Sequence, residues 1–151
     1  MVNIKTLKQL RQQTCISIAL CKKALEQSNN DLIKAKALLR AWGVENVKDK
    51  MQRSTSQGAI FSYVHHNKKI ASIIEILSET DFVSNNDEFQ KLGKELSMQI
   101  ASIPTEKVQD LMNQEYIRDS SKKISDLLQE AILKFGENIK IGRFLRWELG
   151  E

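Results

Sequence analysis

The sequence predicts an α+β protein in which a small bundle of helices precedes an antiparallel sheet that helices cover on one side. Three patterns lead to this prediction. Apolar residues recur at helical spacing over the first 42 residues, short runs rich in β-branched residues begin at position 59, and an alternating segment closes the chain. With 151 residues, of which 41% are hydrophobic, the chain can bury a core without disulfides or metals.

Three short helices are predicted in residues 1–43. Their apolar stripes consist of Ile4, Leu7 and Leu10, then Leu20, Cys21, Ala24 and Leu25, then Leu32, Ala35, Leu39 and Trp42. We expect the first helix to last to about Thr14 and the second to about Ser28. Asn30 or a neighbour can cap the third helix, and we expect Gly43 to end it.

A connector follows the helices at residues 44–58. It begins with helical character and ends in Ser, Thr, Gln and Gly, so it is either a continuation of the third helix or a linker. We therefore expect three parts: a three-helix domain at 1–43, the connector at 44–58, and an α+β core domain at 59–151.

The core domain is predicted to open with a hairpin. Residues 59–64 and 70–77 have the composition of strands, and Asn67 can take the left-handed conformation in the turn between them. A helix marked by Phe89 to Ile100 ends before Pro104, and a short helix follows over 108–112. The clearest helix spans 120–135, with a serine to cap its start and Gly136 to end it.

The last strand is predicted at residues 139–149, as the third strand of the sheet. Its odd positions are apolar except for Arg143, and they are Ile139, Ile141, Leu145, Trp147 and Leu149. We expect this face to meet the core and the even positions to meet water. Gly142, next to the exception, marks a bulge or a close approach of another segment.

Residues with catalytic chemistry are few and badly placed. The chain has no phosphate-binding glycine loop, zinc-protease motif or serine nucleophile elbow. His65 and His66 are neighbours in the predicted turn, and alternation would point them to opposite faces, so they are not expected to share a metal. Cys15 and Cys21 lie roughly 9 Å apart along an ideal helix, which excludes a disulfide. We expect no enzyme, metal or cofactor.

A carboxylate and an aromatic side chain stand together in the polar segment at 78–88. Asp81 and Phe82 directly follow the second predicted strand. Phe82 could fold back as a plug at the edge of the sheet, with Asp81 or Asp87 capping the next helix. The alternative is an exposed aromatic wedge at a loop tip that anchors a partner. Spacing by itself leaves both interpretations open.

The charge is unevenly divided along the chain. Residues 1–55 hold eleven Lys and Arg against four Asp and Glu, while the remainder carries a net charge of −3. The first part therefore suits an acidic partner, which is either nucleic acid or the acidic face of a protein. A helical adaptor and an RNA-binding protein are the two alternative functions. Basic residues are not interleaved with the aromatic residues on which single-strand binders stack bases.

Four motifs, in the same order and on the same elements, give the chain a family resemblance. They are CKKAL at 21–25, TDFV at 80–83 with Phe89-Gln90 after it, GENI at 136–139, and RFLRWELGE at 143–151. With these motifs the chain resembles translation elongation factor Ts, the nucleotide-exchange factor of elongation factor Tu, nearly from end to end.

The resemblance implies a ubiquitin-associated-like (UBA-like) three-helix domain, one α+β core subdomain, and a non-enzymatic exchange factor. In the family the TDFV loop enters the GTP-binding domain of elongation factor Tu and disturbs its Mg²⁺ site. By motif, the wedge is Phe82 and the carboxylate is Asp81, with Thr80 and Val83 shaping the loop. The N-terminal helices dock on the same domain, and the residues expected there are Arg11, Ile18, Ala19 and Lys22.

Other expectations also rest on the resemblance. Long members carry a second core subdomain, for which 151 residues leave no room. Short members can pair, so the resemblance leaves both a monomer and a homodimer open. No direct nucleic-acid contact and no membrane association are expected. The compartment is the bacterial cytoplasm, or a plastid stroma or organelle matrix. The family has two glycines after the first helix that are absent between Cys15 and Leu20, which alters that turn.

Overall fold

The computed structural model describes residues 1–14 and 16–151, with the main chain alone at 44–48. It divides into two units, Met1–Lys50 and Met51–Glu151, and the division falls inside the predicted connector. Cys15, which the sequence analysis considered together with Cys21, lies outside the described residues. Within the described part of the chain, no helix combines the length and the apolar character that crossing a bilayer requires.

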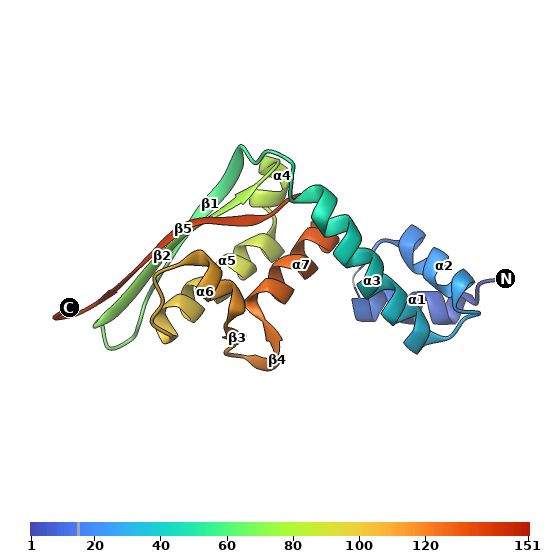
Figure 1. Cartoon of the computed structure of the whole chain (residues 1–151), viewed down its shortest axis with the longest axis horizontal. Helices are drawn as coiled ribbons and strands as arrows, with labels where there is room; N and C mark the ends of the chain where they lie inside the picture. The colour runs from blue at the N-terminus through green and yellow to red at the C-terminus, as the bar shows by residue number, and fades with distance from the viewer. Residues whose placement is uncertain (15) are drawn as a thin grey trace. The chain divides into compact units, whose positions relative to one another are not determined.

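The first unit consists of the helices α1 (Ile4–Thr14), α2 (Ile18–Gln27) and α3 (Leu32–Lys50) (Figure 1). They enclose a small core whose buried members are Leu10, Cys21, Ala24, Leu25, Ala35 and Leu39. All six belong to the predicted apolar stripes, which confirms the three helices. The ammonium group of Lys23 lies 5.2 Å from the centre of the Trp42 ring, and this cation–π contact joins α2 to α3.

The ends of these helices differ in part from the prediction. The carboxylate of Asp31, a neighbour of Asn30, accepts hydrogen bonds from the N–H groups of Ile33 and Lys34 at 2.9 and 3.1 Å, and so starts α3. The predicted end at Gly43 is wrong, because α3 continues to Lys50. A glycine inside a helix costs only about 1 kcal/mol relative to alanine, and Gly43 has no positive φ that would turn the chain away.

The second unit is built on a three-stranded antiparallel sheet in the order β1-β2-β5, as predicted. Its strands are β1 (Gln57–Val64), β2 (Ile70–Ser78) and β5 (Lys140–Glu148). The helices α5 (Asp87–Ser102), α6 (Val108–Asn113) and α7 (Ile124–Phe135) lie on one side of this sheet (Figure 1). The α+β fold class is therefore confirmed.

The turn between β1 and β2 uses a different residue from the predicted one. Lys68, with φ of 59°, takes the left-handed conformation, and Asn67 does not. The side chain of Asn67 instead accepts a hydrogen bond from the N–H of Lys69 at 2.9 Å. This local bond turns the chain at Asn67, so the left-handed residue comes one position later.

A bulge interrupts the pairing of β5 with β2. Glu75 pairs with Arg143 and Ile76 pairs with Ile141, so Gly142 is an extra residue on β5. A Cβ atom on Gly142 would overlap the carboxylate of Glu75. The bulge and the close approach predicted at Gly142 are both present.

The bulge reverses the alternation that the sequence predicts for the last strand. Ile139 and Ile141 are buried, but Leu145, Trp147 and Leu149 are exposed, so the predicted inward face is wrong beyond Gly142. One additional residue moves every following side chain to the other face of the sheet. The even positions after the bulge are partly buried instead, as the burial pattern of β5 shows.

The predicted start of α7 is also wrong. Residues 119–123 form a strand, β4 (Asp119–Lys123), which pairs with β3 (Glu115–Tyr116). The helix begins at Ile124, and the carboxylate of Asp126 accepts a hydrogen bond from the N–H of Lys123 at 2.9 Å. No serine caps it. Its end at Gly136, which has φ of 71°, is as predicted.

The β3–β4 hairpin is fastened to α5 through Tyr116. The hydroxyl of Tyr116 donates a hydrogen bond to the carboxylate of Glu95 at 2.7 Å. Partial burial, and then the bond to Glu95, raise the pKa of Tyr116 to about 12. Both effects favour the neutral phenol, so this contact remains intact at neutral pH.

The side chains of Phe61, Phe89 and Phe135 join β1, α5 and α7 in one aromatic core. The ring centroids of Phe61 and Phe89 are 5.9 Å apart, and those of Phe89 and Phe135 are 6.4 Å apart. Gly93 on α5 faces this core, and a Cβ atom there would overlap the Phe61 ring. The glycine thus lets α5 lie close to the sheet.

We predict that Gly93→Ala lowers the free energy of unfolding by about 1–3 kcal/mol, because overpacking the core outweighs the ~1 kcal/mol gain in helix propensity. Urea unfolding followed by circular dichroism measures the change. The double variant Phe61→Leu/Gly93→Ala should lose less than the sum of the two single variants, since the smaller side chain makes room. Additive losses would show that the two positions do not compete for space.

Candidate partner-binding site

The chain turns where β2 ends, and this turn carries the predicted loop Thr80–Val83. It forms a single helical turn, α4 (Asp81–Ser84). The hydroxyl of Thr80 accepts a hydrogen bond from the N–H of Val83 at 3.5 Å and acts as the N-cap. One helical turn cannot persist on its own hydrogen bonds. The surroundings of α4 must therefore hold its shape.

Side chains of this turn point in opposite directions. Val83 and Ser84 are buried where α4 packs against β1 and β2. Asp81 is exposed, and Phe82 is 85% exposed. The interpretation of Phe82 as a plug at the sheet edge is therefore wrong. The turn thus exposes the Phe82 ring to solvent on one side and buries Val83 and Ser84 in the protein on the other.

The helix that follows the turn is capped by a residue that the sequence analysis did not choose. The side chain of Asn86 accepts a hydrogen bond from the N–H of Glu88 at 2.8 Å, so neither Asp81 nor Asp87 caps α5. The ammonium of Lys134 on α7 donates to the carboxylate of Glu88 at 3.1 Å. This hydrogen bond holds the pKa of Glu88 below its ordinary value.

Glu137, in the segment between α7 and β5, contacts the start of the loop. Its carboxylate accepts hydrogen bonds from the N–H of Thr80 at 3.0 Å and from the hydroxyl of Thr80 at 2.7 Å. In the sequence, Glu137 stands out only as part of the GENI motif, which indicates no role for it. Its contact with Thr80 depends on the register of β5 against β2, which a single sequence does not reveal.

The four residues predicted for docking in the first unit are all exposed: Arg11, Ile18, Ala19 and Lys22. Ile18, Ala19 and Lys22 lie in the first turns of α2, where a spacing of three or four residues places side chains on one face. Ser17 caps this helix by accepting a hydrogen bond from the N–H of Leu20 at 3.4 Å. The altered turn thus starts α2 without glycine.

The two histidines are placed differently from the prediction. Their rings lie side by side, with centroids 4.1 Å apart and planes tilted by 51°, so they do not point to opposite sides. The hydroxyl of Tyr63 and Nδ1 of His65 are 2.9 Å apart, within hydrogen-bonding distance. In the described residues, His, Cys, Asp and Glu side chains nowhere gather in a group of three or more that could hold a metal ion.

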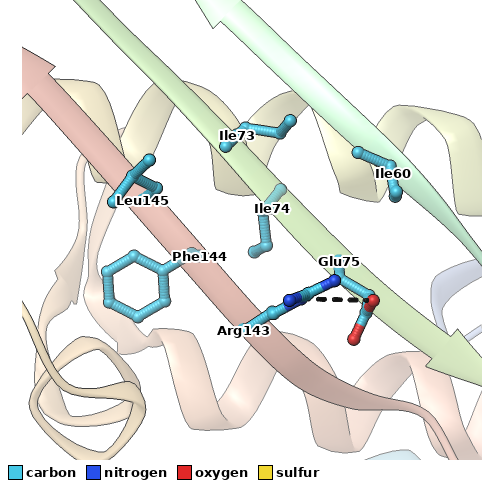
Figure 2. A pocket seen from close by; sticks show the side chains of 7 residues that line it. All are labelled: Ile60, Ile73, Ile74, Glu75, Arg143, Phe144 and Leu145. Carbon is cyan, nitrogen blue, oxygen red and sulfur yellow. Dashed lines mark ion pairs between the residues drawn. The ribbon is translucent and has the colours of Figure 1, made fainter.

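The face of the sheet opposite the helices is largely apolar. On this face, side chains of neighbouring strands lie opposite each other in rows across the sheet. The exposed apolar side chains in these rows are Ile60, Val64, Ile73, Leu145 and Trp147. We call these five residues the open sheet face. A shallow groove of about 320 Å³ lies on it, and Figure 2 shows the pair Glu75–Arg143 at its side, with Nε and Oε2 3.6 Å apart.

Comparisons with known proteins identify relatives of this chain. An Elongation factor Ts from Thermosipho melanesiensis is 33% identical over 196 aligned positions, which cover all of this chain and all of that protein. The chain belongs to the elongation factor Ts family. Family members from Leptospira biflexa and Thermotoga maritima are 35% and 34% identical, and each alignment covers 99% of this chain and at least 97% of the relative.

A family sequence profile also matches the part of the chain that carries the loop. The sequence profile described as Elongation factor TS matches residues 79–151, which begin one residue before Thr80 and include Glu137. The alignments run over more than 190 positions against 151 residues here, so these relatives contain segments without a counterpart in this chain. The protein is a translation elongation factor.

We predict that Phe82→Ala changes the free energy of unfolding by no more than about 0.5 kcal/mol, because the ring is exposed. Val83→Ala, one residue later, should cost about 1–2 kcal/mol, since Val83 is only 8% exposed. Parallel urea titrations of the two variants test this difference. A destabilised Phe82→Ala would mean that the ring packs against the protein.

Proposed function

We propose that the chain is a guanine nucleotide exchange factor for elongation factor Tu. It binds the GDP form of that protein, disturbs the Mg²⁺ site, and promotes release of GDP so that GTP can bind. The observation that carries the proposal is the exposed ring of Phe82 beside the exposed carboxylate of Asp81, on a turn anchored to the sheet. An exposed aromatic ring on a turn that the fold holds in place is a typical anchor of a protein interface.

The physical basis is the charge of the metal ion. Mg²⁺ is usually the largest local charge that holds nucleotide phosphates, so a wedge that disturbs its ligands weakens GDP strongly. Phe82 supplies the wedge, and Asp81 supplies a carboxylate near the metal. Thr80 and Val83 shape the loop from below. The chain makes and breaks no covalent bond in this scheme, so it is not an enzyme and needs no cofactor.

The first unit supplies the second contact in the proposal. Arg11 and Lys22 carry positive charge to the surface, and Ile18 and Ala19 add exposed area in the first turn of α2. Residues 1–55 hold eleven Lys and Arg against four Asp and Glu, and the rest of the chain is net negative, so this unit suits an acidic surface on the GTP-binding domain of the partner. We place the activity where ribosomes work, in a bacterial cytoplasm or in a plastid stroma or organelle matrix.

The exchange function is tested by stopped-flow release of a fluorescent GDP analogue from elongation factor Tu. The parent chain should accelerate GDP release. The acceleration by Phe82→Ala should be at least about tenfold smaller, which corresponds to an activation free energy ~1.4 kcal/mol higher. Ile33→Ala is the matched control, because Ile33 is another exposed apolar side chain but belongs to α3. It should behave as the parent does.

Three other results would each contradict the proposal or a part of it. A parent chain that never accelerates release would overturn exchange and favour a helical adaptor. Fast release by both the parent and Phe82→Ala would move the mechanism away from the ring. Tight RNA binding that falls linearly with the logarithm of the salt concentration would favour the RNA-binding alternative.

We also propose that the chain forms a homodimer through the open sheet face. A two-fold interface brings the same patch of both copies together. The open sheet face is apolar, and the charged residues Glu75 and Arg143 beside its groove pair with each other. Trp147, Leu145 and Ile60 are 70%, 49% and 65% exposed, so pairing would remove large apolar side chains from water.

Sedimentation equilibrium tests the dimer. The parent should sediment as two copies, and Trp147→Lys should sediment as one, because each dimer would bury two unpaired ammonium groups. Ile33→Lys introduces the same charge at an exposed position on α3 and should leave the dimer intact. A parent chain that is a monomer at every concentration would contradict this proposal and leave exchange untouched.

A further inference from the structure

The pairing of β2 with β5 extends beyond the last residues of the two strands. After the bulge, Leu77 pairs with Lys140. The same register, continued toward the loop, sets Glu79 opposite Asn138 and Thr80 opposite Glu137. At both of these positions, the two segments are joined by hydrogen bonds to side-chain carboxylates and not by backbone pairing. The loop therefore starts at a fixed place relative to the segment between α7 and β5.

Glu137 uses both of its oxygen atoms on one residue. Oε1 accepts from the N–H of Thr80 and Oε2 accepts from its hydroxyl, at 3.0 and 2.7 Å. Bonds to an ionised carboxylate are stronger than those between neutral groups. The same Thr80 hydroxyl caps α4 by accepting from the N–H of Val83. Glu137 thus acts on the cap of the turn that carries Phe82.

A second bond runs in the opposite direction between the two segments. The N–H of Asn138 donates to the carboxylate of Glu79 at 2.7 Å. The buried side chain of Asn138 donates to the carbonyl oxygens of Arg53 at 2.8 Å and Met51 at 3.4 Å. The guanidinium of Arg53 lies 3.6 Å from Glu79. These contacts hold the segment that contains Glu137 in place, and so they fix the position from which the Glu137 carboxylate reaches Thr80.

The exposed ring has no comparable support of its own. Phe82 is 85% exposed, and α4 has only four residues, so neither ring contacts nor helix length determine its direction. The direction is determined by the buried Val83 on one side and by the capped Thr80 on the other. Val83 lies where α4 packs against β1 and β2, and the hydrogen bonds of Thr80 come from Glu137, in the segment between α7 and β5.

We propose that Glu137 is a positioning residue for nucleotide exchange, which aims Phe82 at the partner by holding Thr80. This inference rests on the proposed exchange function. A wedge works only when it arrives in the correct geometry, and a shift of about 1 Å in a working group can lower a rate by as much as 10²-fold. Glu137 itself does not touch the partner in this account, and its effect passes through the ring.

A double-mutant cycle of Glu137→Ala and Phe82→Ala tests the inference. GDP release from elongation factor Tu is measured as a function of factor concentration, to separate the saturating rate from the half-saturating concentration. Glu137→Ala should lower the saturating rate about tenfold and change the half-saturating concentration less than about threefold. In the Phe82→Ala background the same substitution should change the saturating rate less than about twofold, because the ring it aims is gone.

Three further variants show whether the bonds themselves matter. Thr80→Val removes the hydroxyl and should resemble Glu137→Ala, whereas Thr80→Ser keeps the hydroxyl and should lose less. Glu137→Gln keeps the shape of the side chain and one acceptor oxygen, so its loss in the saturating rate should lie between those of the parent and Glu137→Ala. This variant replaces Glu137→Ala in the test if the alanine variant does not fold. Glu130→Ala, on the exposed face of α7 and paired with Lys122, is the matched control and should release GDP at the parent rate.

The outcomes separate this inference from the function on which it rests. Equal losses from Glu137→Ala with and without the Phe82 ring would overturn the positioning role, since a general structural defect acts in both backgrounds. A Glu137→Ala variant as fast as the parent, next to a slow Phe82→Ala, would overturn it while exchange stands. A parent chain without exchange activity would overturn both.

Discussion

The register in which β5 pairs with β2 is the constraint on which the rest of the second unit depends. It places Glu137 opposite Thr80 and so decides where the exposed turn begins. The bulge at Gly142 sets this register, because it shifts the pairing by one residue between Glu75 and Ile76. The same bulge turns Trp147 away from the helices and into water. One extra residue thus determines both where the anchored loop begins and that Leu145 and Trp147 belong to the open sheet face.

In the second unit, the Phe82 ring and the open sheet face leave large apolar side chains in water, although the fold does not need them there. The core is closed by the aromatic contacts of Phe61, Phe89 and Phe135 and by the buried residues of α5 and α7. Neither the Phe82 ring nor the open sheet face contributes to it. Large exposed apolar side chains held on rigid elements are characteristic of interfaces. The proposed partner and the proposed second copy would each cover one of these surfaces.

Sequence reasoning succeeded where one local period determines the structure. The helical stripes of residues 1–42 and the hairpin strands follow from spacing, and the TDFV loop stood out because Phe82 lies in a polar segment.

Prediction from the sequence failed where pairing between residues far apart in the chain determines the structure. Gly142 indicated a bulge or a close approach, but the alternation at 139–149 still predicted that Leu145 faces the core, because only the pairing with β2 shows that the bulge reverses the faces. Residues 120–123 continue an apparently helical segment, but pairing with β3 makes them a strand. Glu137 was missed because its contact with Thr80 joins residues 57 positions apart.

The central claim is that this chain and Mg²⁺·GDP oppose each other on elongation factor Tu, and linkage makes the claim directly measurable. If the chain weakens GDP binding by some factor, GDP must weaken binding of the chain by the same factor. Isothermal titration of the chain into elongation factor Tu, first free of nucleotide and then saturated with GDP and Mg²⁺, measures that factor. The account predicts much weaker binding to the GDP form, with a ratio equal to the loss of GDP affinity measured in the reverse titration. Equal affinities for the two forms would contradict it.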